Sequence, residues 1–366
     1  MRPVIVARRM TTFHGVAYGR RLVYPVNDPM AKRALEQGTR MKGLVTVFGG
    51  SGFVGSQIVR SLAKRGLRVR VAVRQPGRGY RLRMLGDVGQ IEVVQANVRN
   101  PASVARALDG AEAVVNAVGV LYEVGRQQFQ SLHVMGAQTI AQAAAAEGIT
   151  RFVQISAIGA DPQSPAKYGR TKAEGEAAVR EAVPAAVVIR PSIVFGQDDH
   201  FFNFFASMAM TSPVLPLIGG GTTRFQPVFV GDVAAAVAAA VTDPAHVGLT
   251  FELGGPAPHT FKALMELMLQ EIQRNRILLP IPFPAAKLLA VGGDVLCAAR
   301  GVLALIPPPP ITTDQVEMLR IDNVVAPGAL GLANLGVPAT AMEPILPTYL
   351  YRYRRGGQYA DTIAAV

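Results

Sequence analysis

Residues 45–55 read Val45-Thr46-Val47-Phe48-Gly49-Gly50-Ser51-Gly52-Phe53-Val54-Gly55, and this stretch decides the fold. Four β-prone residues run into a glycine turn, and apolar residues at 58, 59, 62 and 63 follow at helical spacing. The order is therefore strand, tight turn, helix. Glycine allows positive φ and close backbone approach, and the free N–H groups at a helix start attract anions.

The glycine spacing, Gly-x-x-Gly-x-x-Gly, is related to the dinucleotide fingerprint, with the first gap one residue longer. A purely structural strand-to-helix turn is the alternative. Since a second strand follows at 69–73, we predict a nucleotide site in this turn. Its expected contacts are Gly49, Ser51, Gly52, Phe53, Val54 and Gly55.

Apolar runs that suit strands alternate with helical patterns along the first two thirds of the chain. Strands are expected at 44–48, 69–73, 91–94, 113–116, 151–155 and 186–190, and helices at 54–65, 101–108, 131–147 and 168–182. The strand runs are continuously apolar, which is typical of parallel strands covered on both faces. The pattern predicts an α/β protein with a Rossmann-type doubly wound parallel sheet in residues 43–255.

The remainder is expected to form a smaller, discontinuous C-terminal region over residues 256–366, with substrate-side insertions from about 191. A strand at 250–253 is expected to return to the sheet or to flank it. An apolar helix is predicted over 285–306, in which Lys287 and Asp294 share a narrow polar stripe. It is either a core helix of the smaller region or a helix that docks on a membrane surface or a partner subunit.

The 366 residues carry a net charge of +12, and the excess is concentrated near the start. Residues 1–40 hold eight Lys or Arg against Asp28 and Glu36, and they show no sustained periodicity. We expect residues 1–42 to be a poorly ordered basic extension. A targeting segment, a basic arm, or sequence upstream of a start at Met41 would share this composition. No nucleic-acid site is expected, because stacking aromatics do not alternate with the basic residues.

Several classes of site are disfavoured by composition. Cys297 is the single cysteine, so neither an intrachain disulfide framework nor a cysteine metal cage is expected. The five histidines show no metal-binding spacing, and no metal site is predicted. The longest uncharged run, 201–223, contains Pro213 and Pro216, so a membrane-spanning helix is not expected there.

The second predicted strand ends in Arg74, where a nucleotide without a ribose phosphate usually meets a carboxylate. An arginine can clamp a 2′-phosphate, and nine Lys or Arg but no acid occur from Gly43 to Arg83. We therefore expect NADP(H) to be preferred over NAD(H). The alternative is that Arg74 and Arg78 are solvated surface charges.

Small and polar residues follow the later strands. Asn97 and Val98 come after the third strand, where a short side chain could reach the adenine. Ala117, Val118 and Gly119 follow Asn116 and would let the backbone pass beneath the nicotinamide ribose. Both positions fit the rule that ligands bind at the carboxyl ends of parallel strands, although asparagine is also a common turn former.

Ser156, Tyr168 and Lys172 form the combination with the most chemical potential. A Tyr-x-x-x-Lys spacing places both side chains on one helix face, so the ammonium is expected to lower the phenol pKa and to hold the cofactor ribose. The serine, at the end of the fifth strand, could bind a substrate carbonyl. Together they could move a proton while a hydride is transferred.

The chain resembles the extended or atypical short-chain dehydrogenase/reductase superfamily, which includes epimerase/dehydratase-like proteins. The resemblance covers about residues 43–255. It rests on the glycine turn, Asn97, Asn116-Ala117, Ser156, Tyr168-x-x-x-Lys172, the 190–196 segment Arg-Pro-Ser-Ile-Val-Phe-Gly and the 230–234 segment Val-Gly-Asp-Val-Ala. It implies that Tyr168 and Lys172 are the catalytic pair and that Pro191 lies near the nicotinamide. Asn97 departs from the aspartate that many relatives carry.

Three segments are similar to the dehydrogenase-like accessory subunits of respiratory complex I, NADH:ubiquinone oxidoreductase: residues 155–161, 195–205 and 226–230. This resemblance implies a tightly held NADPH with a structural role, complex I subunits as partners, and peripheral association with the matrix or cytoplasmic side of the energy-transducing inner membrane.

Because Ser156, Tyr168 and Lys172 are all present, a second hypothesis stays open. The chain would then be a free-standing NADP(H)-dependent oxidoreductase or epimerase/dehydratase acting on a small carbonyl or hydroxyl substrate. A redox sensor that reports NADPH to a partner is a third, non-enzymatic interpretation.

Overall fold

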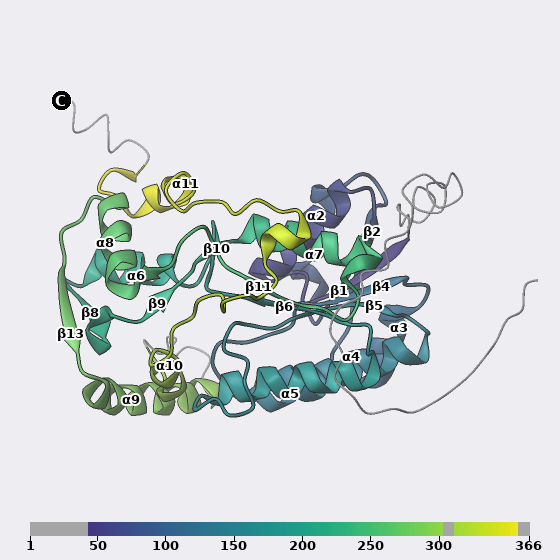
Figure 1. Cartoon of the computed structure of the whole chain (residues 1–366), viewed down its shortest axis with the longest axis horizontal. Coiled ribbons are helices and arrows are strands. Elements are labelled where there is room, and N and C mark those ends of the chain that lie inside the picture. Colours follow the sequence, from purple (N-terminus) through teal and green to yellow (C-terminus); the bar gives the residue numbers. More distant parts are fainter. Residues whose placement is uncertain (1–42, 303–310, 358–366) are drawn as a thin grey trace, which may run out of the picture. The chain divides into compact units, whose positions relative to one another are not determined.

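Seven parallel strands form the central sheet of the computed structural model, in the order β11-β6-β5-β4-β1-β2-β3 (Figure 1). The structure describes residues 43–302 and 311–357. The strands are β1 (Leu44–Phe48), β2 (Arg68–Val73), β3 (Ile91–Gln95), β4 (Ala113–Asn116), β5 (Arg151–Ile155), β6 (Val187–Pro191) and β11 (Thr250–Leu253). The strand order reverses between β1 and β4, and at such a point the carboxyl ends of neighbouring strands open a crevice for ligands.

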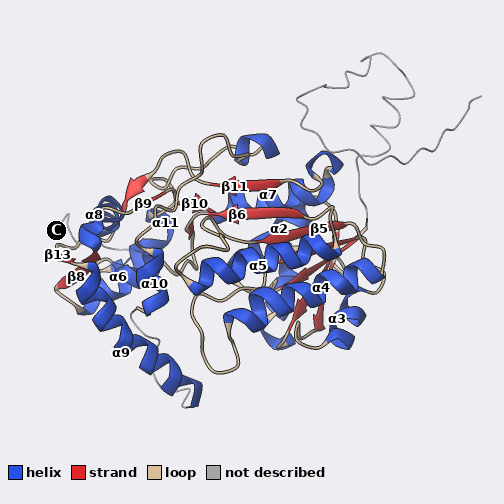
Figure 2. Ribbon diagram, turned by 60° about the horizontal axis from the view of Figure 1, so that its bottom comes forward, coloured by secondary structure: helices blue, strands red, loops and turns tan. Residues whose placement is uncertain are grey.

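Helices cover both faces of this sheet (Figure 2). They are α2 (Phe53–Lys64) and α7 (Val230–Thr242) on one face, and α3 (Pro101–Leu108), α4 (Met135–Ala146) and α5 (Lys167–Ala182) on the other. Ile58 and Val237 share a buried cluster with β1 side chains on the first face, and Ile140 and Val179 do so with Phe48 and Phe152 on the second. Burial on both sides explains why all five residues of β1 are buried and apolar or β-branched.

The predicted doubly wound α/β fold is confirmed. The first six predicted strands and the helices predicted at 54–65, 101–108 and 168–182 match the observed elements to within one residue at each end, whereas the helix predicted over 131–147 is divided into a π-helical turn and α4, which begins at Met135. The strand predicted at 250–253 is β11, which pairs with β6 in the main sheet. A feature that periodicity did not predict is the π-helical turn Gln130–Val134, which leads directly into α4.

A smaller part of the molecule packs around an aromatic cluster that includes Phe195, Phe202, Phe225 and Phe261. Its helices are α6 (Phe202–Thr211), α8 (Phe261–Glu271) and α11 (Pro347–Leu350). Its short strands form three pairs: β7 (Val194–Phe195) with β10 (Val228–Phe229), β9 (Arg224–Phe225) with β12 (His259–Thr260), and β8 (Val214–Ile218) with β13 (Ile277–Ile281). The smaller part is thus built from separate stretches of the chain.

Helices α9 (Phe283–Val302) and α10 (Thr313–Met318) pack against one another beside the start of α5 (Figure 1). Ala286 and Ala290 of α9 form a small buried cluster with Ile218 and Val316. The helix predicted over 285–306 therefore begins two residues earlier, and its predicted last residues, 303–306, lie outside the described residues. The basic extension predicted for residues 1–42 also lies outside them.

The segment after α10 contacts both parts of the molecule. Leu332, Leu335 and Val337 join the buried cluster of α2 and α7, whereas Leu346 and Leu350 join the aromatic cluster. Within residues 43–302 and 311–357, no helix combines the length and the apolar character that crossing a membrane requires.

Candidate functional site

The glycine turn places backbone against backbone where the sheet order reverses. Gly49 has φ of 77°, and a Cβ there would lie 2.9 Å from the backbone of Ala117, beyond β4. A Cβ on Gly55 would lie 2.3 Å from the Gly49 carbonyl oxygen. Gly52 precedes α2, and its carbonyl accepts the Ser56 N–H at 2.9 Å. Side chains at 49 and 55 would therefore collide with the protein's own backbone, so glycine at both positions lets the turn close tightly before the start of α2, where free N–H groups can meet a pyrophosphate.

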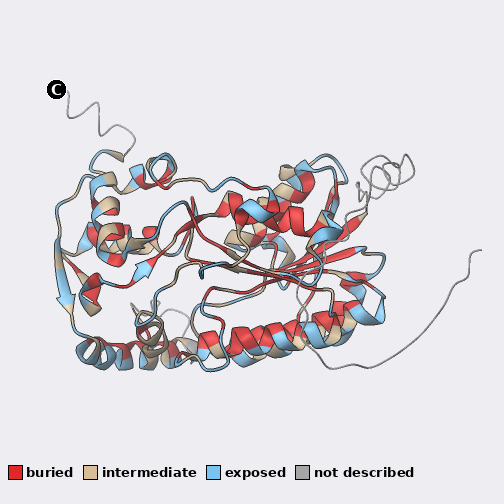
Figure 3. Ribbon diagram, in the orientation of Figure 1, coloured by how far each residue is buried: buried red, intermediate tan, exposed pale blue. Residues whose placement is uncertain are grey.

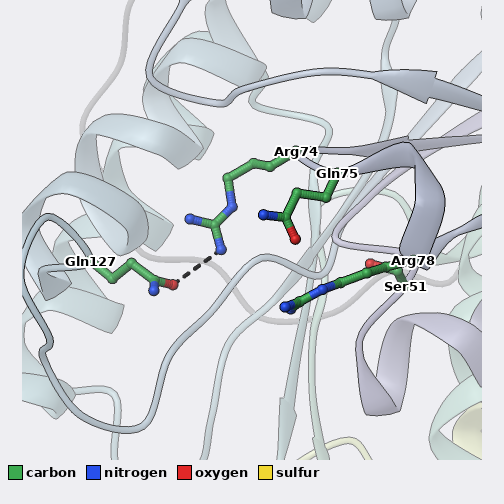
Figure 4. A pocket seen from close by; sticks show the side chains of 5 residues that line it. All are labelled: Ser51, Arg74, Gln75, Arg78 and Gln127. Carbon is green, nitrogen blue, oxygen red and sulfur yellow. Dashed lines mark hydrogen bonds between the residues drawn. The ribbon is translucent and has the colours of Figure 1, made fainter. Parts of the chain in front are cut away.

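A pocket of about 400 Å³ adjoins this turn and is lined by Ser51, Arg74, Gln75, Arg78 and Gln127 (Figure 4). Arg74 Nη2 donates to Gln127 Oε1 at 3.1 Å, so the loop after β4 reaches across to the end of β2. These five lining residues include two guanidinium groups and no carboxylate. The pocket therefore suits an anion, and Gln127 is a lining residue that sequence reasoning missed.

The predicted residues after β3 and β4 lie in different surroundings. Asn97 accepts the Arg99 N–H through Oδ1 at 3.1 Å, and the Val98 side chain is buried in the core close to Gly136. Val118 donates its N–H to Asn116 Oδ1 at 3.1 Å. A Cβ on Gly119 would lie 3.4 Å from Lys172 Nζ, so the β4 loop passes directly beside the lysine.

Of the other predicted contacts, Val54 packs against the core cluster and Phe53 lies close to Gly196.

Ser156, Tyr168 and Lys172 are brought together at the carboxyl end of β5. Lys172 Nζ donates to the Ile155 carbonyl at 3.3 Å and lies 5.7 Å from the centre of the Tyr168 ring. Ser156 donates its backbone N–H to the Ile189 carbonyl at 2.7 Å. Its Oγ is buried and has no hydrogen-bond partner among the described residues. A buried hydroxyl without a partner is costly, which fits a ligand oxygen at this position.

Pro191 ends β6 beside this group, and its carbonyl accepts the Ile158 N–H at 3.0 Å. Arg190 and Glu176 form a bidentate ion pair that ties β6 to α5, with N–O distances of 2.9 and 2.6 Å. This pair fixes the middle of α5 against β6. It therefore also fixes how far Tyr168 and Lys172, on the same helix, lie along the sheet.

The expectation that Lys172 lowers the phenol pKa was wrong. Burial, and secondarily the Asp314 carboxylate, raise the pKa of Tyr168 to about 12. Burial lowers the pKa of Lys172 to about 8, against the opposing effect of Glu176. Removing both groups from water disfavours their charged forms, and this outweighs their mutual proximity.

His133 is a part of this site that sequence reasoning missed. It is buried on the π-helical turn, and its Nε2 accepts the Val120 N–H at 3.2 Å while Nδ1 lies 3.2 Å from Thr171 Oγ1. Its ring stacks on Phe129 and meets the Tyr168 ring edge-on. Burial, and then Lys172, lower the His133 pKa to about 2, so the imidazole is neutral and holds the β4 loop against α5.

Comparisons with known proteins agree with this geometry. A family model described as NAD(P)H-binding matches residues 49–194, so the chain carries an NAD(P)H-binding domain. Among solved structures, an NADPH-dependent quinone oxidoreductase from Escherichia coli complexed with NADPH has a TM-score of 0.64 and 19% identity. The alignment covers 84% of this chain and 98% of that one. At this identity the likeness shows the fold alone.

Two relatives match over most of their length. NADH dehydrogenase (ubiquinone) 1 alpha subcomplex subunit 9, mitochondrial, of Arabidopsis thaliana is 35% identical over 341 residues, which are 92% of this chain and 84% of that protein. The Mus musculus protein of the same name is 33% identical over 357 residues, which are 96% and 90% of the two chains. The chain belongs to this family. The resemblance to complex I accessory subunits, predicted from three short segments, is therefore confirmed.

This member of the subunit 9 family has a further contact that no local pattern could reveal. Asp314, on α10, accepts the backbone N–H groups of Lys167 and Tyr168 at 2.5 and 3.1 Å. A partner 146 residues away in the chain leaves no periodic signal, and His133 likewise meets Thr171 of α5, 38 residues away, only through the fold.

Proposed function

We propose that this chain is an NADP(H)-binding accessory subunit of respiratory complex I, NADH:ubiquinone oxidoreductase, in which the nucleotide serves mainly to hold the fold. Relatives named as NADH dehydrogenase subunits support the assembly, since they match most of the chain. The observation that supports a structural role is that the expected nucleotide contacts, namely the glycine turn, the β4 loop and the Tyr168–Lys172 pair, come from the carboxyl ends of β1, β4 and β5. Burial raises the pKa of Tyr168 to about 12, so its phenol is protonated at pH 7 and can donate a hydrogen bond to a ligand.

The residues present fit a bound dinucleotide. The glycine turn would hold the pyrophosphate, and Tyr168 and Lys172 would hold the nicotinamide ribose. The buried Oγ of Ser156 would gain the partner that it lacks among the described residues. Bound NADPH would supply a hydride at its nicotinamide ring. These groups would first hold the ligand and, through it, the carboxyl ends of β1, β4 and β5.

A preference for NADP(H) is supported by the arginine pocket. Arg74 and Arg78 both line it, and their charges would favour a 2′-phosphate over a 2′-hydroxyl. Titrating the apoprotein with NADPH and NADH is expected to give the lower Kd for NADPH. Arg74→Gln is expected to reduce the ratio of the two affinities by about tenfold or more, the cost of one charged hydrogen bond.

Arg81→Gln is the matched control, because Arg81 is exposed on the same connection after β2 and does not line the pocket. It removes the same charge and is expected to leave the ratio unchanged. Equal loss of preference in both variants would mean that the general positive field, rather than the pocket, selects the nucleotide. A lower Kd for NADH than for NADPH in the wild type would contradict the preference itself.

Peripheral membrane contact is supported by α9 and β13, which are largely exposed or half-buried (Figure 3) and whose exposed residues are mostly apolar. Among residues 283–300 of α9, a narrow stripe is buried, at Ala286, Ala290, Gly293 and Cys297. The exposed apolar residues around it include Leu288 at 76% and Val295 at 63% exposure, together with Leu289, Val291, Ile277 and Leu279. A helix with an apolar outer face fits the interfacial layer of a bilayer, on the matrix or cytoplasmic side of the inner membrane.

Flotation with vesicles of phosphatidylcholine and cardiolipin tests this contact. The wild type is expected to float with the vesicles, and Leu288→Gln combined with Val295→Gln is expected to stay in the dense fraction. Met84→Gln is the control, because Met84 is 82% exposed but lies between β2 and β3. A wild type that does not float would count against membrane contact.

Assembly is tested by separating solubilised inner membranes by size and probing the fractions for this chain. We expect it to migrate with the NADH dehydrogenase activity of complex I. Migration only as a free protein would overturn the proposed assembly, whatever the nucleotide affinity.

A free-standing NADP(H)-dependent oxidoreductase or epimerase/dehydratase is the second candidate, favoured by the unpartnered Ser156 Oγ next to Tyr168 and Lys172. It requires turnover of a small carbonyl or hydroxyl compound that is lost in Tyr168→Phe. A panel of such compounds with no Tyr168-dependent turnover would remove its support.

A further inference from the structure

Helix α5 begins without a cap of its own. It starts at Lys167, directly after Ala166, whose methyl side chain cannot accept a hydrogen bond. Its first turn, Lys167-Tyr168-Gly169-Arg170, contains no acidic residue. The first N–H groups of a helix have no acceptor within the helix, so this start needs an acceptor from elsewhere.

Asp314 provides that acceptor from the other end of the chain. One carboxylate oxygen accepts the Lys167 N–H at 2.5 Å, and the other accepts the Tyr168 N–H at 3.1 Å. An aspartate is among the best acceptors at a helix start, where its charge also faces the positive end of the helix dipole. Tyr168, whose N–H is held in this way, is also the residue at the start of α5 that belongs to the candidate nucleotide site.

The position of Asp314 is set by α9 and α10. Thr312 and Gln315 form a reciprocal capping box that shapes the first turn of α10. Thr313 Oγ1 donates to Asp294 Oδ2 at 2.6 Å, and Lys287 Nζ donates to Glu317 Oε1 at 2.9 Å. Lys287 and Asp294, which share one stripe of α9, thus both hold α10.

We propose that Asp314 is a positioning residue that fixes Tyr168 for nucleotide binding and links the α9–α10 pair to the nucleotide site. The inference rests on the proposed NADP(H) function. The link is reciprocal by thermodynamic necessity: a bound nucleotide that requires an ordered α5 start also stabilises α10 in its place. If contact with a membrane surface held α9 and α10 in place, it would strengthen nucleotide binding by the same linkage.

The size of the effect follows from the loss of one helix cap. Replacing a capping aspartate by alanine typically shifts a local equilibrium by about fivefold. When the binding-competent state is populated less, the apparent Kd rises by the same factor. Asp314→Ala is therefore expected to raise the Kd for NADPH about fivefold. Asp314→Asn keeps one of the two acceptor oxygens and is expected to raise the Kd by less than Asp314→Ala does.

The decisive comparison is between NADPH and adenosine 2′,5′-bisphosphate, measured by calorimetric titration of the full chain. The bisphosphate can engage the Arg74 pocket but lacks the nicotinamide ribose. Asp314→Ala is expected to weaken NADPH and to leave the bisphosphate Kd unchanged, because α2 and β2 do not depend on α10. Asp322→Ala is the control. Asp322 lies on the same C-terminal segment as Asp314, but it accepts the backbone N–H of Arg224 in β9 and does not touch α5.

Hydrogen exchange adds a second readout. NADPH is expected to slow amide exchange in residues 313–318 of the wild type and not of Asp314→Ala. The inference is overturned if Asp314→Ala binds NADPH as the wild type does, or if it weakens both ligands equally, as general destabilisation would. If the wild type binds neither ligand, the nucleotide site itself is refuted. If the wild type binds NADPH and Asp314→Ala binds it equally well, only the role of Asp314 is refuted.

Discussion

Replacing Lys172 by methionine is expected to stabilise the apoprotein while weakening its hold on NADPH. Lys172 is 6% exposed, and its ammonium donates to one carbonyl, that of Ile155, at 3.3 Å. A charge with so little solvation is expensive in the absence of a ligand. Methionine has a similar length and no charge, so it fills the same space without that cost.

The magnitude follows from the lysine pKa. Burial lowers it from the ordinary value of 10.5 to about 8, which corresponds to about 3 kcal/mol against the charged form. Losing the hydrogen bond to Ile155 costs about 1 kcal/mol. The net gain in unfolding free energy at neutral pH is about 2 kcal/mol. For a chain of 366 residues that raises Tm by roughly 3 °C.

The assay is urea unfolding of apoprotein at several pH values, with Lys167→Met as the control. Lys167 lies one turn earlier on α5, half exposed, where its pair with Glu123 is worth at most about 1 kcal/mol. Because the folded pKa of Lys172 is below the unfolded one, the unfolded chain holds more protons between pH 8 and 10.5. Wild-type stability therefore rises relative to Lys172→Met across this window, and the variant's advantage is largest below pH 8.

A Lys172→Met protein that is less stable than the wild type at pH 7 would refute this reasoning. The same variant is expected to raise the Kd for NADPH by about tenfold or more, since it removes a charged donor. Gains in both stability and affinity would show that Lys172 does not serve the nucleotide.

Three further predictions concern the surroundings of the site. Gly55→Ala is expected to raise the Kd for NADPH by about tenfold or more, because its Cβ would lie 2.3 Å from the Gly49 oxygen, and fluorescence titration showing wild-type affinity would contradict this. Tyr349→Phe removes the 2.5 Å hydrogen bond to the buried Asp199 and is expected to lower the unfolding free energy by about 1–3 kcal/mol in urea, with an unchanged midpoint as the contrary result. His133, with its pKa lowered to about 2, is expected to show no change in ring proton shifts between pH 5 and 8 by NMR, and a titration there would mean that the imidazole is not held neutral.

The local elements of the fold were predictable because each has its own signal. The continuous apolar runs of β1 and β5 and the glycines at 49, 52 and 55 depend on neighbours within a few residues. The Tyr-x-x-x-Lys spacing likewise needed only the geometry of one helix. The residues that escaped prediction, Gln127, His133 and Asp314, reach the site across gaps in sequence that leave no periodic trace.

By itself, the sequence determined that a strand, a glycine turn and a helix would build a dinucleotide site, because only glycine tolerates those backbone contacts. It also determined that Ser156 would follow the fifth strand and that Tyr168 and Lys172 would share one face of the next helix. The tertiary structure alone decided their ionisation. Burial holds the Tyr168 phenol protonated and lowers the Lys172 pKa, opposite to what their spacing suggests for the phenol. Desolvation and the distant Asp314 cap arise only when the chain has packed, because both depend on what surrounds a group in space rather than in sequence.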